Sequence, residues 1–260
     1  MKQLALGLVT AIAIGASLAH AQWLKYPTPG IPRLPDGKAN LNAPAPRMAD
    51  GKPDLSGLWR ATRNLINDIG AGTQPGELVM LPAADALLRE RIANSQRDDP
   101  SASCIPGGVP RTTFVGSFYP FRTISTAGRF VILYEAIHSW REIFADGRDL
   151  PADMNPTWMG YSIGKWEGDE FVVLTAGFND RGWLDNRGHP ATERLRITER
   201  FSRRDFGHMD IRITVDDPGA YAKPFTVTLP LLFQADEDLL EYVCNENNRY
   251  FERVPKTPSR

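Results

Sequence analysis

Cysteine and histidine are scarce in this chain, whose 260 residues include two cysteines and four histidines. Past residue 21 the histidines are His138, His189 and His208, which lie on separate segments and lack the short spacing of a metal-binding motif. The glycine-rich signatures of nucleotide-binding loops are missing as well. We therefore expect no metal and no cofactor. A metal site built from one histidine and carboxylates is the alternative.

Long apolar runs are also missing, except at the start of the chain. Lys2, an apolar run from Leu4 to Leu18 and the small residues of Ala19-His20-Ala21 predict a secretory signal peptide over residues 1–21, cleaved near Ala21. No later segment approaches the length of a membrane-spanning helix. We expect an exported protein, periplasmic or secreted, with no membrane span.

Neither sign of charge is in large excess, since 30 basic and 31 acidic residues are interspersed along the chain. A surface for nucleic acid or an anionic membrane needs clustered basic residues, so neither partner is expected. A small-molecule ligand is the partner class that remains. The sequence does not indicate an oligomeric state.

The two cysteines, Cys104 and Cys244, are far apart in the chain. An isolated pair in an exported protein predicts a disulfide, and two buried free thiols are the alternative. A bond that closes so long a loop should stabilise the fold by roughly 5 kcal/mol in the chain-entropy model.

Residues 22–56 are rich in proline and glycine and contain a near-duplicate, 35–41 and 49–55, with an Asp-Gly turn in each copy. We interpret this segment as an extended arm that packs against the body, and a flexible linker is the alternative. One helix is predicted over 82–96, because Pro82 suits a first turn and apolar residues follow at three- and four-residue spacing.

Residues 57–260 are predicted to form a single β-domain, which Gly57-Leu58-Trp59 opens in the manner of lipocalin-type barrels. Short alternating segments are separated by turn signals at the spacing typical of barrels and sandwiches. The later predicted strands are 114–117, 121–125, 129–135, 139–145, 158–166, 171–176, 193–202, 208–215, 225–233 and 239–243. This pattern predicts an all-β fold, an antiparallel meander closed as a lipocalin-like barrel by hairpin connections. A sandwich is the alternative closure.

The loop from Trp183 to Glu193 carries the clearest candidate for chemistry. A fold-back at Gly188 would let Asp185 orient His189, whose imidazole titrates nearest neutrality and suits a general base. Glu193 is within reach of the same group. The alternative is a solvated loop whose aspartate and histidine make turn hydrogen bonds.

Arginine supplies further candidates, since Arg141 and Arg148 flank the Asp146-Gly147 turn. If Arg141 points into the barrel, its guanidinium could receive a carboxylate or an oxyanion. A buried Arg141 paired with Glu142, Asp146 or Glu167 is the alternative. Arg148 is a second candidate for ligand binding.

Four tryptophans lie in the most strand-rich part of the chain: Trp140, Trp158, Trp166 and Trp183. Aromatic side chains of this kind could wall a site for a flat or sugar-like ligand. At strand spacing they could equally be plain core.

Several motifs follow one another in order: Pro53-Asp54-Leu55-Ser56-Gly57-Leu58-Trp59, Cys104-Ile105-Pro106-Gly107-Gly108-Val109-Pro110-Arg111, Trp166-Glu167-Gly168-Asp169, Trp183-Leu184-Asp185, Asp216-Asp217-Pro218-Gly219-Ala220-Tyr221 and Glu241-Tyr242-Val243-Cys244-Asn245-Glu246-Asn247. With these motifs the chain resembles a family of exported bacterial proteins of unknown function. The resemblance implies a single exported domain, and it brings no established activity.

These observations predict an exported barrel that holds a small apolar or aromatic molecule. The sharper hypothesis is a cofactor-independent acid/base enzyme, such as a lyase, isomerase or hydrolase, with His189 as base, Asp185 as its orienting group and Arg141 as the oxyanion or carboxylate partner. The alternative is a non-catalytic carrier, or an envelope interaction module that uses the proline-rich arm.

Overall fold

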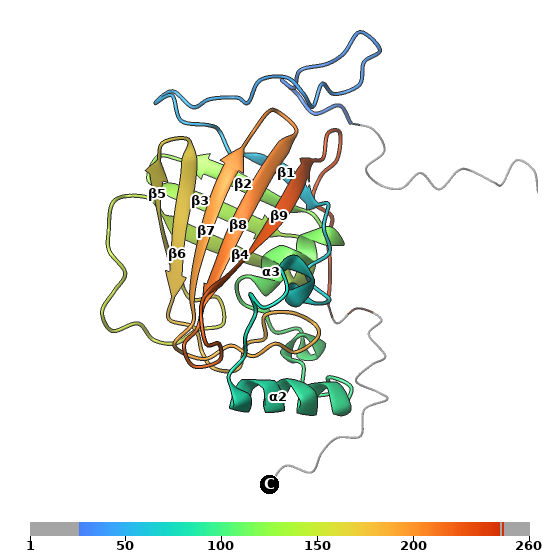
Figure 1. Cartoon of the computed structure of the whole chain (residues 1–260). Helices are drawn as coiled ribbons and strands as arrows, with labels where there is room; N and C mark the ends of the chain where they lie inside the picture. Colours follow the sequence, from blue (N-terminus) through green and yellow to red (C-terminus); the bar gives the residue numbers. More distant parts are fainter. Residues whose placement is uncertain (1–25, 245, 247–260) are drawn as a thin grey trace, which may run out of the picture.

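The structure is a computed structural model that describes residues 26–244 and residue 246 (Figure 1). The predicted signal peptide lies outside these residues. Within the described part, nine strands close into one barrel, which confirms the predicted fold class. The strands are β1 (Gly57–Ala61), β2 (Phe121–Thr126), β3 (Arg129–Tyr134), β4 (Ser139–Phe144), β5 (Tyr161–Glu167), β6 (Glu170–Ala176), β7 (Arg196–Arg203), β8 (His208–Asp216) and β9 (Phe225–Phe233).

Alternate residues of each strand point into the barrel, as the sequence pattern requires. In β8, for example, Ile211, Ile213 and Val215 are fully buried. They belong to one continuous core that also contains Phe130, Phe171 and Phe201. The interior is therefore packed with side chains, most of them apolar.

The connection between β4 and β5 differs from the prediction. We expected a hairpin, but β5 runs parallel to β4, and the two strands pair only at Ile143 with Ser162 and at Phe144 with Ile163. A parallel pair needs a connection that returns to the same end of the sheet, and residues 145–160 form that long loop. The other neighbouring strands pair antiparallel.

Two predicted strands are wrong. Residues 114–117 are helical, in α3 (Arg111–Phe114) and the following turn η3 (Val115–Ser117). All four residues of α3 are buried, so this helix is a short plug, and the Phe114 N–H donates to the Pro110 carbonyl. Residues 239–243 form no strand, because their amides bond to side chains instead: Leu240 N–H to Glu135 and Tyr242 N–H to His138.

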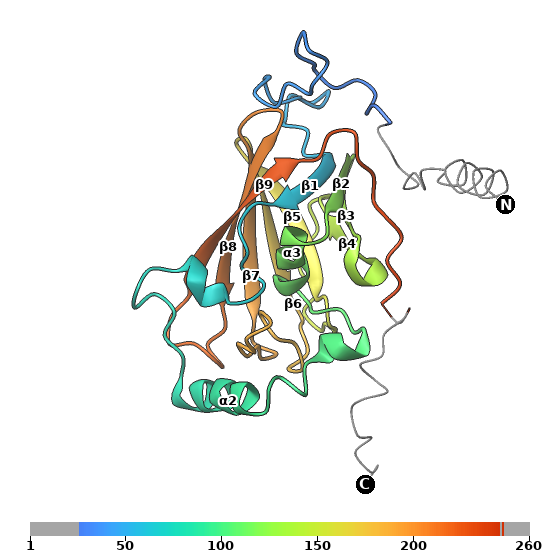
Figure 2. The ribbon, with the colours of Figure 1, turned by 90° about the vertical axis from the view of Figure 1, so that its right-hand side faces the viewer.

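The predicted helix is α2 (Pro82–Ala93), which lies at one end of the barrel (Figures 1 and 2). It ends before the predicted residue 96, because Ser95 and Gln96 have left-handed backbone conformations. Figure 2 shows α3 between β1 and α2 in that view. Short 3₁₀ turns complete the described helical segments: η1 (Ile69–Gly72), η2 (Pro100–Ser103) and η4 (Ala136–His138). No helix among the described residues is long and apolar enough to cross a membrane.

The arm lies at the opposite end of the barrel from α2 (Figure 1). Its near-duplicate segments dock in the same way, each through an arginine that holds a carboxylate on the body. Arg33 binds Asp236 at 2.6 Å, and Arg47 binds Asp169 at 2.7 Å. Each arginine also donates to the glycine carbonyl of its own Asp-Gly turn. Each copy of the repeated segment therefore binds the barrel domain through the same kind of contact.

Beneath the arm, the guanidinium of Arg203 lies over the ring of Trp59 in β1. The guanidinium carbon is 4.9 Å from the centre of the Trp59 ring. Arg203 donates to backbone carbonyls, including those of Asp54 and Phe206, and burial lowers its pKa to about 10. The first strand, the arm and β7 are thus joined at this end.

The predicted disulfide between Cys104 and Cys244 is present. It ties the loop after η2 to the segment that follows β9, across 140 positions of sequence. Because a long loop is closed, the bond restricts the unfolded chain strongly.

Candidate functional site

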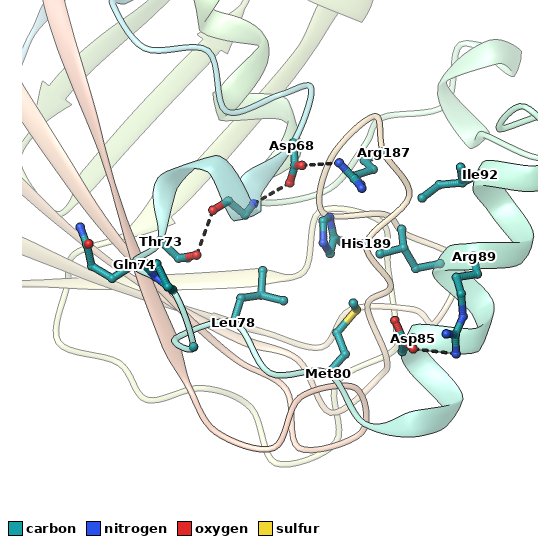
Figure 3. A pocket seen from close by; sticks show the side chains of 14 residues that line it. Asp68, Thr73, Gln74, Leu78, Met80, Asp85, Arg89, Ile92, Arg187 and His189 are labelled. Carbon is teal, nitrogen blue, oxygen red and sulfur yellow. Dashed lines mark hydrogen bonds and ion pairs between the residues drawn. The ribbon is translucent and has the colours of Figure 1, made fainter.

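A cleft of about 520 Å³ lies at the α2 end of the molecule, outside the barrel interior (Figure 3). Its apolar wall consists of Leu78, Met80, Leu88 and Ile92. Its polar groups include His189 and two ion pairs, Asp68 with Arg187 at 2.7 Å and Asp85 with Arg89 at 2.7 Å. A concave, largely apolar site with a few polar groups is typical of small-molecule binding.

His189 is held in the cleft wall by Asp185, and these two candidate residues are in direct contact. The distance from His189 Nδ1 to Asp185 Oδ2 is 2.6 Å, and both residues are buried, His189 with 4% and Asp185 with 0% of its surface exposed. The imidazole Nε2 makes no hydrogen bond within the described part of the chain. It is the ring nitrogen left to meet a ligand.

The loop folds back at Gly188, which has a φ of +105°. Leu184 N–H donates to the His189 carbonyl, and Trp183 and Pro190 form an isolated bridge, so the loop is a tight, paired turn. A side chain at Gly188 would lie within 3.1 Å of atoms of Arg91. Glycine is therefore needed there for both conformation and space.

Asp185 is saturated with hydrogen bonds. Besides His189 Nδ1, its carboxylate accepts from the backbone N–H groups of Ile69 at 2.7 Å, Gly188 at 3.0 Å and His189 at 3.1 Å. Because these backbone donors fix the carboxylate as an acceptor, Nδ1 carries the proton and the lone pair of the neutral imidazole lies on Nε2. That tautomer is the one a general base in the cleft requires.

Side chains from two helices brace the loop. Arg91 of α2 lies 4.5 Å from the ring centre of Trp183 and donates to the Gly188 carbonyl at 2.8 Å. Burial lowers the pKa of Arg91. Arg111 of α3 reaches the same loop through Asn186 at 2.8 Å. The helix that walls the cleft therefore also positions His189.

Asp68 was not identified from the sequence, yet it lines the cleft with His189. Its side chain caps η1 by accepting from Gly70 N–H at 2.8 Å and also binds Arg187. In the sequence, Asp68-Ile69-Gly70 is recognisable as the start of a short helical turn, with Asp68 as its cap. Nothing in the sequence placed that cap beside a loop more than one hundred residues away.

Asp68, Asp185 and His189 are also a group of possible metal ligands, with candidate atoms within 4.8 Å of one another. Both Asp185 oxygens already accept two hydrogen bonds each, and Asp68 is held by Gly70 and Arg187. A catalytic zinc usually takes three protein ligands. Binding one here would break several of these bonds, so the group is better described as a hydrogen-bond network.

Arg141 does not line the cleft with His189. It points into the barrel, where it binds Glu199 at 2.5 Å, Thr175 at 2.6 Å and Ser162 at 3.0 Å. Glu199 was not among the partners considered, and it neutralises the charge that an anionic ligand would need. Attraction to Glu199 raises the pKa of Arg141 against the effect of burial, and burial raises that of Tyr134 nearby.

Ser162 belongs to a short sequence motif at the start of β5. Gly160-Tyr161-Ser162-Ile163-Gly164 matches G-x-S-x-G, the signature of many serine hydrolases. In those enzymes the serine lies on a sharp turn between a strand and a helix. Here Ser162 is buried within β5 and bonded to Arg141, so this match is not a nucleophile.

The four tryptophans do not form a common wall. Trp140 is on the outside of β4 with 68% of its surface exposed, whereas Trp183 is buried under Arg91. Trp166 packs on Phe171 of the core, and no ring contact joins any two of the four. Trp158 lies in the loop before β5, with Arg181 over its ring.

Glu193 and Arg148 also lie away from His189. Glu193 is exposed in a separate hollow beside Arg194, because the chain leaves the loop at Pro190 and turns towards β7. Arg148 is paired with Asp146 at 2.6 Å and bonds to Tyr161 on the surface, which raises its pKa. The site that the structure assembles is thus smaller than the predicted set.

No model of a known protein family matches the chain, and a search of curated proteins finds no match either.

Proposed function

We propose that this protein is a cofactor-independent acid/base enzyme that acts on a small, partly apolar molecule in the cleft beside α2. The observation that carries the proposal is the buried Asp185–His189 pair in the cleft wall, in which Nδ1 is bound and Nε2 makes no hydrogen bond to any described residue. In this role Nε2 removes a proton from the substrate, and Asp185 stabilises the imidazolium that forms.

The rest of the cleft supports the same chemistry. The apolar wall of Leu78, Met80, Leu88 and Ile92 would hold the apolar part of a substrate and exclude water from the base. Asp68 and Arg187 face the same space and would orient a polar group. The reaction class this arrangement fits is proton abstraction, as in a lyase or an isomerase, or activation of water, as in a hydrolase.

We further propose that the protein works after export, as a member of the family of exported proteins that its motifs resemble. The disulfide supports this location, because such bonds persist mainly in oxidising compartments. The expected mature chain begins at Gln22. Sequencing the N-terminus of protein recovered from the periplasm of a bacterial host tests this, and retention of the leader in the cytoplasm would contradict it.

A second candidate is a carrier of a small apolar or aromatic molecule, without turnover. The observation that favours it is that every charged side chain named in the cleft has an ionic partner, leaving the apolar wall as the main contact surface. Such a site binds by burial of apolar area and needs no reactive group.

Proton exchange separates the two candidates before the substrate is known. The protein would be incubated in D₂O with aryl ketones, aromatic hydroxy acids, lactones and aryl esters, and ¹H NMR would record loss of C–H signals or new products. His189→Gln should abolish any exchange or turnover. His208→Gln is a matched control, since His208 also binds an aspartate, Asp205 at 2.7 Å, but on the half-exposed surface. Ligand-induced thermal stabilisation without exchange or products would instead support the carrier.

A further inference from the structure

The barrel interior contains a buried polar group that the proposed chemistry does not use. Arg141 of β4 reaches Ser162 of β5, Thr175 of β6 and Glu199 of β7. Arg141 and Glu199 have side chains 2% and 0% exposed. Tyr134 of β3, also buried, bonds to Thr113 of the α3 plug. One arginine thus connects four consecutive strands inside the barrel.

The ion pair is made through a single contact. Arginine and a carboxylate commonly bind through two parallel hydrogen bonds, but here only Nη2 and Oε2 meet, at 2.5 Å. Arg141 Nη1 and Glu199 Oε1 are both buried and have no partner within the described part of the chain. One is a donor and the other an acceptor, so the two would bond if they faced each other at hydrogen-bond distance.

We infer that a single water molecule is bound inside the barrel between these two atoms, accepting from Arg141 Nη1 and donating to Glu199 Oε1. Buried polar groups in folded proteins nearly always have a partner, and internal waters typically supply it with about three hydrogen bonds. The Tyr134 hydroxyl, which interacts with the Arg141 side chain and bonds to Thr113, is the candidate for the third. The site is independent of the cleft and of His189.

The charges of Arg141 and Glu199 and the apolar residues around them favour a neutral ligand. The pair is neutral as a whole, so an anion would be repelled by Glu199 and a cation by Arg141, whereas a neutral hydroxyl satisfies both. The residues paired with them in the sheet are apolar and fully buried: Ile132 opposite Arg141, and Val173 and Ile213 opposite Glu199. These apolar neighbours offer no further polar partner, so a ligand here needs only the one donor and the one acceptor that a water molecule supplies.

The water would complete the network across the weakest part of the barrel. β4 and β5 share only two paired residues, so few backbone hydrogen bonds close the barrel there. Arg141 crosses this seam with side-chain bonds to β5, β6 and β7. A bridging water fixes the remaining guanidinium nitrogen and thereby the orientation of the whole side chain.

Oxygen-17 relaxation dispersion of the solvent counts long-lived internal waters and tests the assignment. The double variant Arg141→Met/Glu199→Leu removes donor and acceptor together, so no unpaired buried charge remains. Its dispersion amplitude should fall by the equivalent of one water molecule relative to the unmodified protein. The control Arg200→Met/Glu170→Gln removes an ion pair from the outer face beside β7 and should leave the amplitude unchanged. An equal amplitude in the double variant and the unmodified protein would overturn the inference.

Electron density of the unmodified protein decides the question even if the double variant does not fold. The expected result is one peak of water size within hydrogen-bond distance of both Arg141 Nη1 and Glu199 Oε1. A direct contact between these two atoms, or density for a larger molecule, would contradict the assignment to water.

Discussion

Replacing Asp185 with asparagine keeps the shape of the side chain but exchanges one acceptor oxygen for an N–H donor and removes the charge. The carboxylate accepts hydrogen bonds from three backbone N–H groups and from His189 Nδ1. With the new amide nitrogen at the Oδ1 position, two backbone donors, those of Gly188 and His189, would face a donor. With it at the Oδ2 position, only the Ile69 N–H does so, because the imidazole can change tautomer and accept. The second orientation is therefore expected.

The cost follows from that geometry. One buried hydrogen bond to a charged group is lost outright, worth about 1.5–3 kcal/mol, and the remaining bonds become neutral and weaker. We expect Asp185→Asn to lower the free energy of unfolding by about 3 kcal/mol, a large part of the roughly 5–15 kcal/mol of a typical domain. The tautomer change also moves the proton to Nε2 and so removes the lone pair from the cleft.

Two measurements test these expectations separately. Urea unfolding gives the change in free energy, and ¹⁵N NMR of labelled histidine distinguishes a proton on Nδ1 from one on Nε2. Asp205→Asn is the control, because Asp205 binds His208 on the half-exposed surface and should lose about 1 kcal/mol or less. An unchanged tautomer, or a loss for Asp185→Asn no larger than the control's, would refute the proposed role of the pair.

Further predictions concern the parts that hold the site. Cys104→Ser should lower the urea midpoint, with a loss of up to roughly 5 kcal/mol, and an unchanged midpoint would contradict the role of the disulfide. Arg141→Met and Glu199→Leu should each lower the free energy of unfolding by about 3–5 kcal/mol, because each leaves one buried charge without its partner. The double variant should lose much less than the sum of the two, and additive losses in urea unfolding would argue against the pair. Acid should release the arm: Arg33 lowers the pKa of Asp236, so this contribution is complete above the ordinary aspartate pKa and is lost as pH falls through the lowered value. Hydrogen exchange at the arm should therefore increase as the pH falls below the ordinary aspartate pKa and before the barrel unfolds. Unchanged protection there would be inconsistent with this contact.

The sequence alone determined the features that depend on local pattern. Alternation and turn residues predicted most strands and hence the barrel, because side-chain direction along a strand is set by a period of two. The Asp185–His189 pair was also predictable, since the two residues are four positions apart with a glycine between them. The disulfide was predictable because Cys104 and Cys244 are the only two cysteines in the sequence.

Only the tertiary structure decided which distant residues meet. Glu199 lies 58 positions from Arg141, and Asp68 lies in a segment far before His189; both contacts depend on strand register and on how the barrel closes. The parallel seam between β4 and β5 and the helical plug of α3 have the same origin, because burial against neighbouring elements overrode the local strand pattern. Burial also decides against the alternative of a solvated loop, because His189 is packed. We therefore expect His189→Ala to cost stability as well as activity. Sequence pattern specifies the direction of each side chain, and chain closure specifies its partner.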